Sequence, residues 1–115
     1  MKTSNQYDSA TIKYKLTGIG IEKLYVVDED VDCILFLGIY GGNQFLILVS
    51  KGKFSWYSKI VPANIVLEPY WNCKHVVYVP EGLYVFAENI EELIKRITKV
   101  LEKYRRLTSG NLVIT

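Results

Sequence analysis

The sequence predicts an α+β fold in which an antiparallel β-sheet of about six to eight meandering strands, strongly curved or barrel-like, carries one long C-terminal α-helix on one face. Three observations predict it. Two apolar runs flank a glycine-rich turn, further strand-like segments follow through short connections, and one strongly amphipathic stretch lies near the C-terminus. At about 1.5 Å per residue, that helix is long enough to cross several strands.

The bulk composition is typical of a single domain with its own hydrophobic core. We expect the 115 residues to divide into a polar tail (1–9), a sheet (10–87), a helix (89–108) and an edge strand (111–115). Fourteen basic against twelve acidic residues leave a charge of +2, too little to indicate nucleic-acid binding by itself. Because no signal sequence or membrane span is evident, the chain is expected to be soluble and cytoplasmic, without membrane association.

The central stretch predicts a hairpin buried on both faces, in the middle of the sheet. The apolar runs Cys33–Tyr40 and Phe45–Val49 flank Gly41–Gln44, whose glycines and asparagine accept the positive φ of a tight turn. A membrane span is the alternative for so apolar a stretch. It is excluded because the polar, helix-breaking turn falls at its midpoint.

Two strands are predicted before the hairpin. In Ala10–Thr17, apolar and polar residues alternate with period two, which is typical of a strand with one solvated face. A glycine-rich break separates it from a second strand at Ile21–Val27. An acidic loop, Asp28–Asp32, then leads into the hairpin.

Further strands are predicted after the hairpin. Lys53–Ile60 alternates with period two and follows a tight turn, which implies an antiparallel neighbour. Two prolines indicate a long connection over residues 62–73, with a short strand at Ile65–Leu67. Lys74–Val79 and Leu83–Ala87 are expected to pair across a proline–glycine turn.

One helix is predicted after Asn89, a good N-cap with Glu92 three residues later, as in a capping box. Gly110 is the expected stop. The apolar stripe at helical spacing, which should pack on the sheet, comprises Ile90, Leu93, Ile94, Ile97, Leu101 and Tyr104.

Cys73 and His75 are two residues apart and would point the same way on a strand. A thiol beside an imidazole is a nucleophile pair or half of a zinc site in some proteins. The only other cysteine is Cys33 and there is no other histidine, so a zinc site would need an unusual ligand set. We therefore expect a structural thiol and an ordinary histidine, with no metal.

The two cysteines are far apart in the sequence and fit no disulfide framework. The composition is rich in Ile, Val, Tyr, Lys and Glu, however, as in proteins from hot environments, where intracellular disulfides do occur.

No catalytic constellation is evident. Asp28, Asp30 and Asp32 alternate as in a calcium loop, but Cys33 and Ile39 stand where an EF-hand needs Gly and Glu. There is no dinucleotide or Walker motif, and no carboxylate pair is visibly placed for acid–base chemistry. The sequence therefore predicts a protein that is not an enzyme and has no cofactor.

The alternation of basic and aromatic residues is the strongest functional signal. Lys13 and Lys15 lie on the polar side of one predicted strand, and Lys53, Tyr57 and Lys59 on that of another. If these sides form one face, lysines flank an aromatic ring, which suits single-stranded nucleic acid. The alternative is an ordinary solvated face in which Tyr57 packs between lysine stems. The first hypothesis is a small single-stranded nucleic-acid-binding protein.

The second hypothesis is a protein-interaction or oligomerising module, such as a homodimer, that uses an edge strand and the loop of Tyr70 and Trp71. Exposed, these two aromatic residues would be a hot spot for a protein partner; buried, they would cap the open end of the sheet. Electrostatic binding of nucleic acid weakens steeply with salt, whereas an apolar interface responds little.

Overall fold

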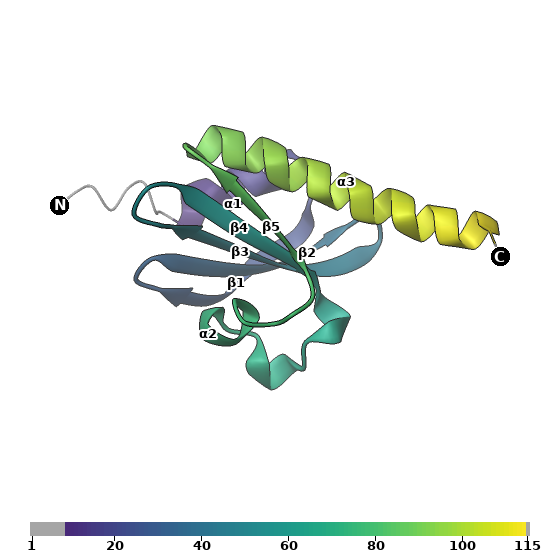
Figure 1. Ribbon diagram of the computed structural model, residues 1–115, viewed down its shortest axis with the longest axis horizontal. Coiled ribbons are helices and arrows are strands. Elements are labelled where there is room, and N and C mark those ends of the chain that lie inside the picture. The colour runs from purple at the N-terminus through teal and green to yellow at the C-terminus, as the bar shows by residue number, and fades with distance from the viewer. Residues whose placement is uncertain (1–8, 115) are drawn as a thin grey trace.

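Five strands that follow one another in the sequence form one antiparallel sheet in the described part of the chain (Figure 1). The structure, a computed structural model, describes residues 9–114, with side chains described through residue 107. The elements in order are α1 (Ser9–Gly18), β1 (Glu22–Asp30), β2 (Cys33–Tyr40), β3 (Asn43–Lys51), β4 (Trp56–Pro62), the 3₁₀ turns η2 (Ala63–Ile65) and η3 (Glu68–Tyr70), α2 (Cys73–Val76), β5 (Leu83–Ala87) and α3 (Ile90–Ile114).

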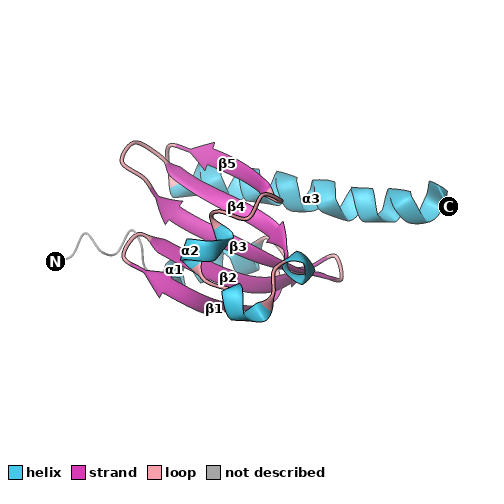
Figure 2. Cartoon of the chain, turned by 60° about the horizontal axis from the view of Figure 1, so that its bottom comes forward, coloured by secondary structure: helices cyan, strands magenta, loops and turns pink. Residues whose placement is uncertain are grey.

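The predicted α+β class is confirmed, with α3 packed on one face of the sheet. Two finer expectations are wrong. Among the described residues the sheet has five strands rather than six to eight, and it is not closed, because β1 and β5 each pair with a single neighbour (Figure 2). The remaining segments that were predicted as strands lie wholly or partly in helices. Segments predicted as strands at Ala10–Thr17, Ile65–Leu67 and Lys74–Val79 contribute to α1, η2 and α2, and residues 111–114 continue α3 past Gly110.

The central hairpin is confirmed. β2 and β3 pair in regular register from Cys33↔Ser50 to Tyr40↔Asn43. The turn between them consists of Gly41 and Gly42, with φ of 58° and 85°, a conformation that glycine adopts without steric cost. Helices or turns cover both sides of this hairpin, which explains its nearly unbroken apolar sequence.

α1 is a helix although its sequence alternates like a strand. Ile12 and Leu16 are buried and four residues apart, so they share a face in a helix as well as in a strand. Tyr14, which the strand prediction placed on the same face, is 80% exposed. The Lys15 Nζ lies 2.8 Å from a Glu91 carboxylate oxygen, so α1 and α3 are also joined by an ion pair on the surface.

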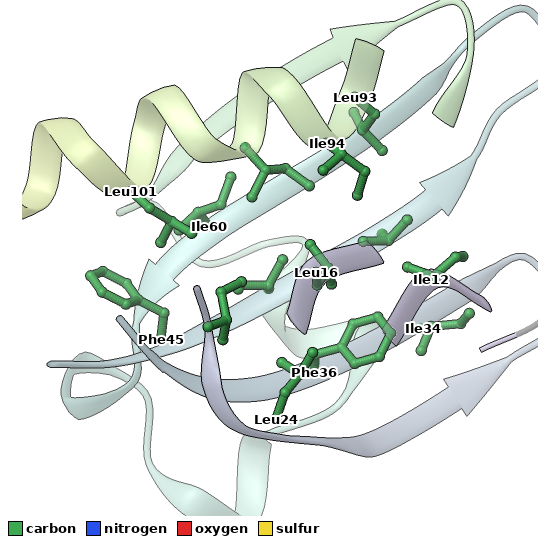
Figure 3. Close-up of a cluster of buried hydrophobic side chains, with 14 of the residues drawn as sticks. Ile12, Leu16, Leu24, Ile34, Phe36, Phe45, Ile60, Leu93, Ile94 and Leu101 are labelled. Carbon is green, nitrogen blue, oxygen red and sulfur yellow. The ribbon is translucent and has the colours of Figure 1, made fainter. Parts of the chain in front are cut away.

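The first face of the sheet is covered by α1 and α3. Figure 3 shows side chains from both helices and the strands meeting between them. The predicted stripe on α3 is confirmed, because Leu93, Ile97 and Leu101 are fully buried. The side chains drawn and labelled there come from both helices and four strands: Ile12, Leu16, Leu24, Ile34, Phe36, Phe45, Ile60, Leu93, Ile94 and Leu101.

The second face is covered by residues 63–79, which include η2, η3 and α2; we call them the cover segment (Figure 2). Apolar side chains of this segment pack on the sheet in a second, smaller core. That core consists of Leu35, Leu37, Leu46, Leu48, Val61, Ala63, Val66, Cys73 and Val76.

A disulfide attaches the cover segment beside β1. It joins Cys33 on β2 to Cys73 at the start of α2, with their Cα atoms 6.5 Å apart. The Cys73 N–H also donates to a carboxylate oxygen of Asp28 on β1, at 2.8 Å. The expected structural thiol at Cys73 is therefore wrong: its sulfur is part of a disulfide, which the sequence left open because 40 residues separate the two cysteines.

Two local expectations concern the ends of α3 and β1. The Asn89 side chain accepts the Glu92 N–H at 2.9 Å, which confirms the N-cap of α3. The predicted acidic loop is mostly strand, since β1 extends to Asp30 and only residues 31–32 form the turn.

Candidate interaction site

An exposed aromatic cluster lies on the second face of the sheet, at the edge formed by β5. Its members are Tyr57 on β4 with Tyr84 and Phe86 on β5. The Tyr57 ring lies 6.4 Å from the Tyr84 ring and 6.0 Å from the Phe86 ring. The Tyr84 and Phe86 rings stack at 6.1 Å, and these residues are 43% and 55% exposed. The edge therefore presents the Tyr84 and Phe86 rings to solvent beside the partly buried Tyr57 ring, and we call these three residues the aromatic cluster.

The register of β4 and β5 builds the aromatic cluster. Tyr57 is opposite Phe86, and neighbouring positions on each strand alternate between the two faces. The side chains of Val85 and Ala87 point to the first face and pack in its core. Those of Tyr84 and Phe86 therefore point to the second face. The cover segment leaves Tyr84 and Phe86 exposed, whereas Tyr57 is partly buried against the second core.

Gly82 brings the chain from the cover segment into β5. Its φ is +105°, which L side chains rarely adopt. A Cβ here would also lie 2.7 Å from a methyl carbon of Val61 and 3.0 Å from the carbonyl oxygen of Ile60. Glycine is therefore required for β5 to lie this close to β4.

Lys59 is buried beneath the aromatic cluster, with only 1% of its surface exposed. Its ammonium donates to the carbonyl oxygens of Val77, at 3.4 Å, and Val79, and lies 5.1 Å from the centre of the Tyr84 ring. Burial lowers the pKa of Lys59, an effect that the nearby Glu81 carboxylate partly offsets. This lysine holds the end of the cover segment against the sheet.

The Tyr84 hydroxyl completes that attachment by donating to the Val77 carbonyl oxygen at 2.7 Å. Burial raises the pKa of Tyr84, and the neighbouring Tyr57 and Tyr78 raise it further. The Tyr84 side chain thus contacts the cover segment through its hydroxyl and leaves part of its ring exposed at the edge.

The backbone of β5 forms the open edge of the sheet. Half of the peptide groups of an edge strand point away from its single neighbour and are available to a further strand. Beside this edge, an open groove of about 490 Å³ lies between β5 and α3. Its lining includes Tyr84, Phe86, Glu92, Arg96, Lys99 and Val100. An extended peptide segment fits such a site through main-chain hydrogen bonds and alternating side chains.

The five residues predicted to form one nucleic-acid-binding face do not share a face. Lys13 and Lys15 lie on α1, which covers the first face, whereas Tyr57 lies on the second. Lys53 is exposed in the turn before β4, and Lys59 is buried. The predicted platform of lysines around Tyr57 is therefore wrong. The cause is that the segment with Lys13 and Lys15 is helical, and that β4, which carries Lys59, is covered on both faces.

The predicted aromatic loop is split between surface and core. Tyr70 is exposed at the end of η3 and its ring lies 4.7 Å from the His75 ring. Trp71 is half-buried in the second core, where its indole N–H donates to the Val66 carbonyl oxygen at 2.7 Å. Tyr70 thus remains a surface aromatic residue, while Trp71 mainly holds the cover segment together.

Cys73 and His75 lie on α2 rather than on a strand. The Cys73 sulfur is bonded to Cys33, so it is not a nucleophile in this state. His75 is exposed, and both its backbone N–H and its Nδ1 lie within hydrogen-bond distance of the Asn72 side-chain oxygen, at 2.9 and 3.0 Å. Among the described residues, no group of three or more His, Cys, Asp or Glu side chains is arranged to hold a metal ion.

Tyr84 and Phe86 are the residues of this site that the sequence analysis missed. The segment Leu83–Ala87 was predicted as a strand, with bounds that the structure confirms, but as the partner of residues 74–79. One signal was present: the segment LYVFA contains no charged residue, unlike most edge strands.

Comparisons with known proteins give no relative to reason from. No protein-family model, curated protein or solved structure matches the chain. None of the helices within residues 9–114 is both long and apolar enough to cross a membrane.

Proposed function

We propose that this protein is a non-catalytic interaction module that binds a protein strand, from another protein or another copy, along β5. The observation that carries the proposal is the open edge of β5, uncharged in sequence and lined by Tyr84 and Phe86. An edge strand of this kind has unpaired N–H and C=O groups that can form hydrogen bonds with another chain. The groove beside α3 supplies room for the side chains of the added strand.

The test is a selection of random ten-residue peptides against the protein, followed by affinity measurements with two variants. Phe86→Lys places a charge in the middle of the site. Tyr25→Lys is the matched control, because Tyr25 is on the opposite edge strand, β1, and is 51% exposed against 55% for Phe86.

We expect selected peptides to alternate apolar and polar residues, to bind the wild type and Tyr25→Lys equally, and to bind Phe86→Lys at least about tenfold more weakly. A selection that yields only peptides indifferent to Phe86→Lys, from a protein that is also monomeric, would contradict the proposal.

Binding of single-stranded nucleic acid is the second candidate, now through the aromatic cluster. The exposed rings of Tyr84 and Phe86, beside the partly buried Tyr57, are surfaces on which bases stack. The strand partner is favoured because Lys59, the cation in contact with the cluster, is buried and donates to carbonyl oxygens rather than facing solvent.

A titration with labelled single-stranded DNA and RNA at two salt concentrations separates the candidates. Nucleic-acid binding predicts affinity that falls steeply with salt and a loss of about 1–3 kcal/mol in Tyr57→Ala, whereas Tyr57→Phe keeps the ring and changes little. Strand addition predicts no binding in this titration at either salt concentration.

A further inference from the structure

The sequence of β5 is complementary to itself. An antiparallel copy centred on Val85 places Tyr84 opposite Phe86 of the copy, and Leu83 opposite Ala87. We propose that the strand that adds to β5 is β5 of a second copy of this chain, so that two sheets join across a twofold axis at Val85. This inference rests on the proposed function and names its partner.

Pairing in this register matches side chains on the second face. Each Tyr84 ring would lie beside a Phe86 ring of the other copy, and both residues are partly exposed in the single chain. Cross-strand aromatic pairs stabilise antiparallel sheets, and a twofold axis makes every such pair occur twice. The aromatic cluster of one copy would thereby continue into that of the other.

The side chains beside α3 also match. α3 runs back along β5 after a short connection, so Glu92 lines the groove near Phe86 and Ala87, while Lys99 lines it nearer Tyr84. A twofold axis at Val85 reverses this order in the second copy and brings Glu92 of each copy toward Lys99 of the other. Opposite charges across an interface set its register.

Arg96 is the charged group of α3 that would lie nearest the axis. Its guanidinium is already paired with Glu92 of its own helix, at 3.2 Å. The like charges of the two Arg96 side chains are therefore partly compensated within each copy, and their length allows the guanidinium groups to turn toward solvent.

The spacing of the helices is compatible with this pairing. α3 lies over β4 and β5 on the first face (Figure 1). Strands are about 4.8 Å apart, so a helix lying between β4 and β5 would be about 10 Å from its twofold copy. Packed helices in proteins are separated by about 8–10 Å. The two copies of α3 would thus contact each other along the groove instead of colliding.

The experiment is sedimentation equilibrium of the full chain with two single variants, Phe86→Lys and Tyr84→Glu. Glutamate is chosen at position 84 because its carboxylate would lie near the buried Lys59 ammonium. We expect a wild-type dimer and an increase of at least about 30-fold in its dissociation constant for each variant, because each substitution removes both symmetry-related ring pairs. Tyr25→Lys should leave the dimer unchanged.

Mixing the two variants tests the register. In the mixed dimer, the introduced glutamate of one chain is opposite the introduced lysine of the other, and one native Tyr84–Phe86 pair remains. We therefore expect association to be restored to within about tenfold of the wild type. Restoration also demonstrates that both variants are folded.

Three results would overturn the dimer: a wild-type chain that is monomeric at all concentrations, a dimer indifferent to Phe86→Lys, or a mixture that is no more associated than its components. A monomeric chain whose selected peptides are sensitive to Phe86→Lys would overturn the dimer alone and leave the proposed function standing.

Discussion

The two edges of the sheet are built in opposite ways. β1 has nine residues, its pairing with β2 shifts register twice, and Lys23 has a φ of 51°. β5 has five residues in unbroken register with β4. β1 also carries many charges, at Glu22, Lys23, Asp28, Glu29 and Asp30, whereas β5 carries none.

Irregular pairing and charge are the devices by which natural sheets prevent another strand from adding to an edge. Both devices are found at β1 and neither is found at β5. The two edges of one sheet can therefore have different tasks. This contrast between β1 and β5 supports the proposal that a further strand pairs with β5.

The attachments of the cover segment differ in the same direction. Beside β1 it is held by the disulfide and by the Asp28 carboxylate. Near β5 it is held by hydrogen bonds from Lys59 and Tyr84. The covalent anchor thus lies beside the β1 edge and the reversible anchor beside the β5 edge.

The largest effect is expected from disrupting the support behind β5. Ile97 is fully buried between α3 and the sheet. Ile97→Asp places an unpaired charge there and should lower the free energy of unfolding by about 5 kcal/mol. Chemical denaturation measures this, with the exposed Lys95→Asp as control. An unchanged transition for Ile97→Asp would show that α3 does not support the sheet as described.

Removing the covalent anchor beside β1 should have the next largest effect. The disulfide closes a separation of 40 residues, which corresponds to about 4 kcal/mol in the chain-entropy treatment. We expect the double variant Cys33→Ser/Cys73→Ser to lose about this much in denaturant unfolding. Reductant should destabilise the wild type to a similar extent and leave the double variant unchanged; equal stability of the oxidised wild type and the double variant would contradict the prediction.

Removing the reversible anchor near β5 should cost less. Lys59→Met keeps the length of the side chain but leaves the carbonyl oxygens of Val77 and Val79 without this donor. We expect a loss of about 1–3 kcal/mol at neutral pH, measured by denaturant unfolding. A loss equal to that of the disulfide variant would remove the contrast between the two anchors.

The pH dependence of the same pair of proteins tests the burial of this lysine separately. Because burial lowers the pKa of Lys59 below its ordinary 10.5, the unfolded chain holds the proton to higher pH than the folded chain. The stability of the wild type relative to Lys59→Met should therefore rise as pH increases from below the folded pKa toward 10.5. A difference between the two proteins that shrinks over this range would contradict the assigned direction.

The smallest effect on folding is expected from charges on the exposed rings of the two edges. Phe86→Lys and Tyr25→Lys replace aromatic side chains that are 55% and 51% exposed. Each should change the free energy of unfolding of the single chain by no more than about 1 kcal/mol, because little burial is lost. Thermal melts at low concentration measure this. A large loss for Phe86→Lys alone would mean that its ring supports the fold rather than a partner.

The elements predicted correctly have signals that are local in the sequence. The turn at Gly41 and Gly42 and the capped, amphipathic helix after Asn89 are specified by residues within a few positions of one another. The α1 segment was ambiguous because Ile12 and Leu16 satisfy both periods. β-branched valines after Cys73 favoured a strand, but the packing of α2 on the second face overrides that preference.

The candidate site could be predicted only in part, because its features depend on contacts between distant segments. Tyr84 and Phe86 form an open edge only because β5 pairs with β4 rather than with residues 74–79. Lys59 has the sequence pattern of a surface lysine until Val77 and Val79 are placed above it. The disulfide likewise requires α2 to lie against β2. None of these pairings is encoded in a local pattern.

The Val77 carbonyl oxygen has a thermodynamic consequence. It accepts from Tyr84 at the open edge and from Lys59 beneath it, and it belongs to the same segment as Cys73, which the disulfide joins to β2. If a partner binds at β5 and orders Tyr84, it favours the cover segment packed on the sheet. That packing in turn keeps the two sulfur atoms together. Linkage is reciprocal. If the disulfide strengthens partner binding by some free energy, the bound partner stabilises the disulfide against reduction by the same free energy.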